Sequence, residues 1–217
     1  MLKIYGRDSS VNVQKVLWAV EELGVPYERL DRGGKYGGID SAEFIALNPH
    51  RKVPTIDDRG VVIWESNAII RYLATKHGPS PLWPDDPVQR AYADQWMDWM
   101  QSTLAADFYD LFWQVVRTPP SKQDSDSIAN AAFRVGHHYT LLDGWLANRR
   151  FILGDNFSLA DIAIGVTLHR YFKVLAEAGL PVREQSALRA WYARLAKRPA
   201  YSRNVMVSYE ELRALDA

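Results

Sequence analysis

Cysteine is absent from this chain of 217 residues. A chain without it has no disulfide, no thiolate metal ligand and no cysteine nucleophile, so any sulfur chemistry must use the sulfur of a substrate. The sequence also lacks the roughly 18 consecutive apolar residues that a membrane helix needs. Its N-terminus, MLKIYGRDSS, contains no apolar signal-peptide segment. We therefore expect a cytoplasmic protein with no membrane partner.

An excess of charge of one sign is missing as well. Lysine plus arginine and aspartate plus glutamate each number 26, and no long run of one sign occurs. Because nucleic acid attracts basic surfaces, we expect no nucleic-acid partner. We also expect no metal, since His137, His138 and His169 have no carboxylate or cysteine cluster at ligand spacing.

Apolar periodicity divides the chain into a small α/β part at 1–78, a linker at 79–87 and an all-helical part at 88–217. The linker is marked by GPSPLWPDDP, which carries four prolines. The order βαβ, α, ββα in the first part predicts a parallel strand pair and then an antiparallel hairpin. The expected strands are 2–5, 27–31, 54–57 and 61–64, and the expected helices follow the first strand and lie near 41–47, 66–77, 88–117, 124–148, 158–178 and 186–197.

Four motifs occur in a fixed order along the chain. They are SVNVQKV (10–16), NPHRKVP (48–54), WESNAII (64–70) and GDNFSLADI (154–162). With the linker near residue 80, they make the chain resemble the glutathione transferase family over nearly its whole length. The resemblance implies an α+β thioredoxin-like domain that holds glutathione, followed by an all-α domain. It also implies a cytoplasmic homodimer active in detoxification, with glutathione as co-substrate and no other cofactor.

The implied catalytic residues are Ser10 and Asn12. Alignment on Lys15 and Gly24 places Ser10 at the serine-type position of the family, where its hydroxyl would donate to the glutathione sulfur and favour the thiolate. Asn12 matches some bacterial members, in which the asparagine amide is a second donor to this sulfur. These residues, or Ser9, also suit the N-cap of the first helix, and the two roles are compatible.

Residues of the second motif are implied to hold the middle and far end of the tripeptide. Val53, before a cis Pro54, would pair its backbone with the cysteinyl part of glutathione, as an added strand does. Arg51 or Lys52 would pair with the glycyl carboxylate, although solvated surface charges explain both residues equally simply. The loop at 32–38, with four glycines, would either close over the peptide or remain a plain surface loop.

Residues of the third motif are implied to hold the γ-glutamyl end. Ser66 would offer its hydroxyl to the carboxylate at a helix start, where an anion is favoured, or would serve simply as the N-cap. Glu65 would accept from the ammonium group, and Asn67 is a further binding candidate. In the fourth motif, Ser158 with Asp161 three residues later indicates a capping box, which is structural.

A small hydrophobic electrophile is the implied second substrate, and it needs an apolar wall. From the aromatic residues of the long helix after the linker we select Phe108, Phe112 and Trp113 for this wall. The same thiolate would also serve reduction of a glutathione-linked disulfide, or an isomerisation. A non-catalytic binding module with this fold is another interpretation, disfavoured because the sulfur-binding and peptide-binding residues are present together.

Overall fold

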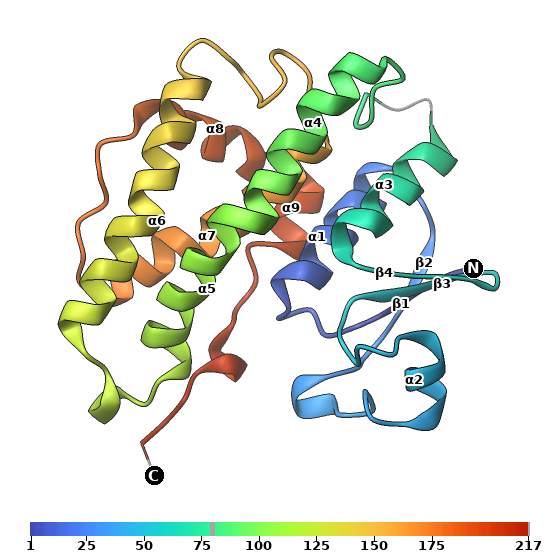
Figure 1. Cartoon of the computed structure of the whole chain (residues 1–217), viewed down its shortest axis with the longest axis horizontal. Helices are drawn as coiled ribbons and strands as arrows, with labels where there is room; N and C mark the ends of the chain where they lie inside the picture. The colour runs from blue at the N-terminus through green and yellow to red at the C-terminus, as the bar shows by residue number, and fades with distance from the viewer. Residues whose placement is uncertain (79–80, 217) are drawn as a thin grey trace.

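The computed structural model describes residues 1–78 and 81–216 and consists of two adjoining domains (Figure 1). The first contains a four-stranded sheet with helices, and the second is mostly helical. This confirms the expected organisation of a thioredoxin-like α+β domain followed by an all-α domain. Two residues of the expected linker at 79–87, Pro79 and Ser80, lie outside the described residues, and the boundaries of the domains stay a prediction.

The sheet has the strand order β2-β1-β3-β4. Strand β2 runs parallel to β1, whereas β3 is antiparallel to both β1 and β4. Ile4 of β1 stands opposite Ile56 of β3, and both are fully buried, so the apolar residues fix which register covers the core. The strands are β1 (Leu2–Tyr5), β2 (Tyr27–Leu30), β3 (Thr55–Asp58) and β4 (Val61–Trp64).

Three α-helices flank this sheet, with α1 and α3 packed together on one side and α2 on the other (Figure 1). Helix α2 begins after Ser41, whose Oγ accepts from the Phe44 N–H at 3.2 Å. Ser66 is not the N-cap of α3, because it is already the first helical residue. Glu65 holds the capping position, with a φ of 70°. The bounds are α1 (Val11–Glu22), α2 (Ala42–Leu47) and α3 (Ser66–His77).

The second domain is built around the central helix α7 and one long helical rod, in which α4 and α5 follow each other. Two π-helical turns, Met100–Leu104 and Trp113–Arg117, make the rod continuous to residue 117, as the sequence predicted. The six-residue α9 was not predicted, since fewer than two turns give no periodicity to detect. No helix in the described ranges is long and apolar enough to cross a membrane. The helices are α4 (Pro87–Trp99), α5 (Ala105–Phe112), α6 (Ser125–Leu146), α7 (Leu159–Glu177), α8 (Ser186–Ala196) and α9 (Pro199–Asn204).

Helix α1 joins the two domains, because it packs on α7 and α9 as well as on α3. Trp18 is fully buried, with its ring centroid 4.7 Å from that of Tyr201 and 5.6 Å from that of Phe157. At the end of α1, the Glu22 carboxylate accepts from Arg198 at 2.7 and 2.6 Å. The buried apolar side chains consequently form one cluster that spans both domains.

The start of α7 is held by a buried carboxylate. Asp161 accepts the N–H and hydroxyl of Ser158, both at 2.9 Å, in the reach-back half of the predicted capping box. It also accepts the Ile152 N–H at 3.0 Å and the Trp191 indole N–H at 2.9 Å. One side chain therefore connects the loop before α7, the helix itself and α8.

The C-terminal tail, red in Figure 1, leaves α9 and runs beside the end of α5. The Ala214 N–H donates to the Val116 carbonyl at 2.8 Å. Glu211, in a short 3₁₀ turn of this tail, accepts from the Ser9 hydroxyl and pairs with Lys35. The tail thus contacts both the turn before α1 and the glycine-rich loop of the first domain.

Candidate active site

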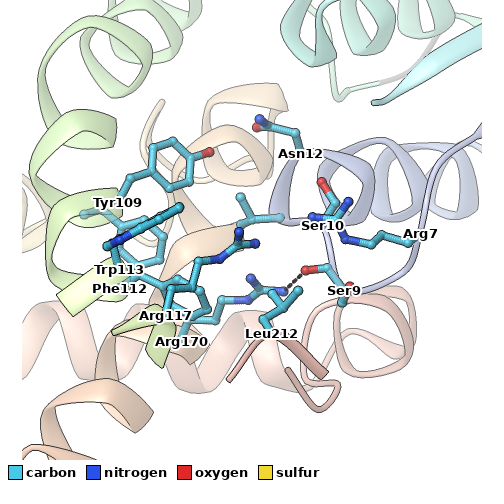
Figure 2. Close-up of a pocket in the computed structure, with 12 residues that line it drawn as sticks. Arg7, Ser9, Ser10, Asn12, Tyr109, Phe112, Trp113, Arg117, Arg170 and Leu212 are labelled. Carbon is cyan, nitrogen blue, oxygen red and sulfur yellow. Dashed lines mark hydrogen bonds between the residues drawn. The ribbon is translucent and has the colours of Figure 1, made fainter. Parts of the chain in front are cut away.

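A cavity of about 320 Å³ lies between the two domains, beside the start of α1 (Figure 2). The first domain contributes Arg7 and residues 9–12. The second contributes aromatic residues of α5 and its π-helical extension, the arginines at 117 and 170, and Leu212 of the tail. A ligand in this cavity would therefore contact both domains at once.

The two serines before α1 have different surroundings. Ser9 is 2% exposed, and its hydroxyl donates to the Glu211 carboxylate. Ser10 is half-buried on the cavity and occupies the N-cap position, where its carbonyl accepts from the Gln14 N–H at 2.8 Å. Its side chain makes no capping hydrogen bond to the described residues. The hydroxyl of Ser10 therefore lies on the cavity as a donor that the helix does not use.

Asn12, the second residue of α1, also lines the cavity. Its Oδ1 accepts from the Ser66 hydroxyl at 3.4 Å, which links it to the start of α3. Figure 2 shows the Tyr109 hydroxyl pointing toward Asn12 from the opposite wall. Burial raises the pKa of the Tyr109 phenol, while a hydrogen bond with Asn12 and the Arg170 charge oppose that rise. Tyr109, an aromatic residue not selected from the sequence, thus faces the predicted catalytic pair.

Lys15 is a buried cation behind the candidate site. Its side chain is fully buried, and Nζ donates to Ser66 Oγ at 3.1 Å and to Asn67 Oδ1 at 2.9 Å. Burial lowers the pKa of Lys15 to about 7, the Glu65 charge opposes this effect, and the Arg71 charge adds to it. Lys15 therefore fixes the start of α3 relative to α1.

The predicted γ-glutamyl ligands meet at the first turn of α3. Ser66 is buried, and Glu65 is exposed. The Asn67 amide has protein partners on both sides, because its Nδ2 donates to the Met97 carbonyl at 3.3 Å while its Oδ1 accepts from Lys15. These three residues lie outside the lining of the cavity. The Asn67 amide is therefore engaged, whereas the backbone N–H groups of this first turn and the Ser66 hydroxyl, whose contact with Asn12 is long at 3.4 Å, can donate to an anion.

The predicted cysteinyl and glycyl ligands lie on the turn before β3. The Val53–Pro54 peptide bond is cis, as the resemblance implied. No backbone hydrogen bond of Val53 occurs among the described residues, so its N–H and C=O are available. Lys52 is exposed, and Arg51 pairs with Asp40 at 3.3 Å on the surface. Like the γ-glutamyl candidates, these residues lie outside the lining of the cavity.

The aromatic residues selected from the sequence all line the cavity. Phe108 and Phe112 are buried, and their ring centroids lie 6.3 Å apart. The side chain of Trp113 is 57% exposed and forms the outer part of the wall. Their contact with an electrophile stays a prediction.

Cationic cavity residues were missed from the sequence. Arg7, Arg117 and Arg170 come from three different elements and meet only in the fold, so no local motif indicates them.

Lys15, which lies outside the lining of the cavity, was used for alignment but given no role, because a lysine in an amphipathic helix is normally solvated. Its burial depends on α3, which begins 51 residues later.

Comparison with known proteins shows the family of the chain. Residues 9–76 match the glutathione S-transferase N-terminal domain, and residues 127–194 match the glutathione S-transferase C-terminal domain. Glutathione S-transferase GstB of Escherichia coli strain K12 is 39% identical over 209 residues, covering 95% of this chain and 99% of that protein. The chain belongs to the glutathione S-transferase family.

Solved structures agree with this assignment. A theta-class glutathione S-transferase from Xanthomonas axonopodis pv. citri, with glutathione bound, is 44% identical with a TM-score of 0.89, over 96% of this chain and 98% of that one. A glutathione transferase from Burkholderia graminis, with two glutathione molecules bound per subunit, is 26% identical with a TM-score of 0.83. That match covers 94% of this chain and 87% of the other.

Proposed function

We propose that this protein transfers glutathione to small hydrophobic electrophiles, with Ser10 and Asn12 stabilising the glutathione thiolate. The observation that carries the proposal is the Ser10 hydroxyl, which lies on the cavity at the N-terminus of α1 without serving as a cap. The glutathione-bound theta-class relative supports glutathione as co-substrate. The proposal includes no metal and no redox cofactor.

The energy required is within reach of this arrangement. A free thiol has a pKa of about 8.5, and lowering it by two units takes about 2.7 kcal/mol of preferential stabilisation of the thiolate. A hydrogen bond to a charged group contributes about 1.5–3 kcal/mol, and a helix N-terminus adds about 0.3–1 kcal/mol. Ser10 at the start of α1, assisted by the Asn12 amide, therefore suffices without a separate base.

The remaining parts of glutathione are assigned to two turns of the first domain. The Val53 backbone, before Pro54, would pair with the cysteinyl unit, because its N–H and C=O are available. The glycyl carboxylate would lie near Lys52, or near Arg51 if the latter releases Asp40. The carboxylate contact is charge-assisted, and the Val53 contact resembles the pairing of an added strand. Neither contact needs a rearrangement of the sheet.

The γ-glutamyl end would lie at the start of α3. Its carboxylate would accept from the Ser66 hydroxyl and from backbone N–H groups, including that of Asn67, and its ammonium would donate to Glu65. Lys15 holds Ser66 and Asn67 from behind. In this arrangement the sulfur would lie near Ser10 and would face an electrophile held against Phe108, Phe112 and Trp113.

A titration of bound glutathione tests the proposal. Thiolate absorbance in the ultraviolet, followed against pH, should show a midpoint about two units below that of free glutathione. With Ser10→Ala, the midpoint should return most of the way to the free value. A wild-type midpoint equal to that of free glutathione would refute thiolate stabilisation.

Reduction of a glutathione-linked disulfide is the second candidate, and Asn12 on the cavity beside Ser10 favours it. The Burkholderia relative with two glutathione molecules per subunit supports space for a second tripeptide. Turnover of 1-chloro-2,4-dinitrobenzene measured beside hydroxyethyl disulfide separates the two reactions. A larger rate enhancement over the uncatalysed reaction for the disulfide would make reduction the main activity.

We also propose that the protein is a cytoplasmic homodimer with a detoxifying role, as the family resemblance implies. Light scattering of the purified protein measures the mass directly. A mass of 24.8 kDa, that of one chain, would contradict the dimer.

A further inference from the structure

Three guanidinium groups line the same cavity as the aromatic wall. Arg7 belongs to the turn before α1, Arg117 to the π-helical end of the long rod, and Arg170 to α7. Figure 2 shows Arg117 and Arg170 reaching into the space between the aromatic wall and the serine turn, with Arg7 on the side of the serines. The lining of the cavity therefore carries three positive charges in addition to Ser10.

No acidic residue lines this cavity within the described chain, and none of the three arginines forms an ion pair with a described residue. Glu211 is the acidic residue beside Arg7, but it is already engaged. Hydrogen bonds from Lys35 and Ser9 lower the pKa of Glu211, partial burial opposes them, and the charge of Arg7 adds a smaller lowering effect. The positive charge in the cavity is thus left without a matched carboxylate.

Arg170 shows most directly that the positive charge lacks a carboxylate partner. Its side chain is only 3% exposed, and one Nη donates to the Ser9 carbonyl at 2.7 Å. Its Nε is buried without a partner, and so is the Nε of Arg7. A buried charged donor without an acceptor is costly, so these groups are set to receive a ligand.

Mutual repulsion among the three arginines also favours an anionic ligand. Burial lowers the pKa of Arg117, and the nearby charge of Arg7 lowers it further. Burial also lowers the pKa of Arg170 to about 10, with Tyr109 and Tyr209 opposing the effect and the other two arginines adding to it. An anion among the three would relieve both the repulsion and the missing hydrogen bonds.

The two carboxylates of glutathione do not account for this anion, and its thiolate is assigned to Ser10 and Asn12. In the proposed function, its γ-glutamyl carboxylate lies at Ser66 and its glycyl carboxylate at Lys52 or Arg51, all outside the cavity lining. The anion is therefore expected on the second substrate.

We infer that the second substrate carries a carboxylate, which binds Arg7, Arg117 and Arg170 while its apolar body lies against the aromatic wall. This inference rests on the proposed function and names its substrate class. For an aryl chloride, the glutathione thiolate forms a bond to the carbon that carries chlorine, and chloride then leaves with the bonding electron pair. The thiol proton goes to solvent, and nothing is oxidised or reduced.

Two electrophiles of nearly equal shape test the inference: 4-chloro-3,5-dinitrobenzoate, which is anionic, and 4-chloro-3,5-dinitrobenzamide, which is neutral. For each, kcat/KM is divided by the uncatalysed rate constant, so that intrinsic reactivity cancels. The wild-type protein should favour the benzoate by about tenfold or more, the size expected for one charge-assisted contact. Equal or higher efficiency with the benzamide overturns the inference.

Variants locate the effect. Arg117→Gln and Arg7→Gln should each reduce the benzoate-to-benzamide ratio several-fold, and Arg117→Lys should retain part of it. Arg149→Gln is the matched control, because Arg149 stacks on Trp145 at 3.9 Å in another part of the second domain. An unchanged ratio in both Arg117→Gln and Arg7→Gln overturns the assignment to these arginines.

Failure of the proposed function is recognised separately, by absence of conjugation with 1-chloro-2,4-dinitrobenzene. Calorimetry with unreactive 3,5-dinitrobenzoate and 3,5-dinitrobenzamide then still tests the anion site, which requires tighter binding of the benzoate. Glutathione disulfide distinguishes two sources of the carboxylate. If glutathione disulfide competes with 3,5-dinitrobenzoate and Arg117→Gln abolishes this competition, the carboxylate belongs to a second tripeptide. If it does not compete, the carboxylate belongs to a small acid. Equal binding of 3,5-dinitrobenzoate and 3,5-dinitrobenzamide overturns the anion site.

Discussion

Ser9 and Ser10 are neighbours in the chain, but the first is a structural residue and the second is the proposed donor to the glutathione sulfur. Ser9 faces inward, where its hydroxyl meets the Glu211 carboxylate. Ser10 faces the cavity, and its hydroxyl makes no capping hydrogen bond. Since α1 needs only the Ser10 carbonyl to begin, the Ser10 hydroxyl can change without loss of the helix.

Replacement of Ser10 by alanine should therefore reduce turnover without unfolding the protein. We expect kcat to fall by about tenfold to a hundredfold, because a hydrogen bond to a charged sulfur is lost. KM for glutathione should change much less, since the tripeptide keeps its other contacts. Steady-state kinetics measure both, and an equal loss in binding would mean that Ser10 positions the peptide instead. Ser41→Ala, at the N-cap of α2, is the control.

Lys15 makes a prediction about pH. Its pKa in the folded protein is lowered to about 7 from 10.5, so between these values the unfolded chain binds a proton that the folded chain has released. Stability contributed by this group is therefore present above 10.5 and is lost as the pH falls toward 7.

The variant Lys15→Met lacks this titration. The unfolding free energy of the wild type minus that of Lys15→Met should rise by up to about 1.4 kcal/mol for each pH unit between roughly 7.5 and 9.5. Urea unfolding at several pH values measures this difference. Parallel pH curves for the two proteins would show that Lys15 keeps an ordinary pKa.

Elements of this fold are held at their starts by particular side chains. Asp161 accepts four hydrogen bonds at the start of α7, from Ser158, Ile152 and Trp191. Because it is fully buried, water cannot replace it after removal. The start of α7 therefore depends on one carboxylate.

Asp161→Ala should destabilise the protein by at least about 3 kcal/mol, since several buried donors lose their acceptor. Thermal or urea unfolding tests this, with Asp155→Ala in the exposed part of the same loop as control. Activity per folded molecule should be nearly unchanged. A loss below about 1 kcal/mol would show that the donors find other partners.

Sequence patterns predicted the elements well where the signal is local. The first-domain strands, the capped α2 and the long rod all lie within a few residues of the expected ranges. Ser66 was misjudged as a possible cap because the positive φ of Glu65 belongs to a tertiary turn that the dipeptide does not reveal. For local elements, periodicity and capping residues carry enough information.

Residues of the candidate site that depend on distant contacts were not predictable in this way. Ser10 and Asn12 stand in a motif, whereas Arg117 and Arg170 reach the cavity only after α7 packs on α1 and α5 packs on α7. Leu212 requires the tail to return across the molecule. Long-range packing, which single-sequence periodicity does not describe, decides these positions.

At the scale of the whole molecule, the two domains share one core through α1. Trp18 is fully buried against Tyr201 and Phe157 of the second domain. Arg198 of the second domain also pairs with Glu22. The interface between the two domains is therefore part of the hydrophobic core.

A fragment of residues 1–78 should accordingly fail to form a stable fold, because the second-domain face of α1 would be exposed to water. The full chain should unfold in a single transition by circular dichroism and by tryptophan fluorescence. A cooperative transition of the fragment alone would show that the first domain is independent of its neighbour.

The route of the C-terminal tail also gives one short segment a hold on both domains. Glu211 of the tail holds Ser9 and Lys35 of the first domain, and the next residue, Leu212, lines the cavity. A protease that removed the tail would therefore open one side of the cavity and expose the Ser9 hydroxyl to water at the same time.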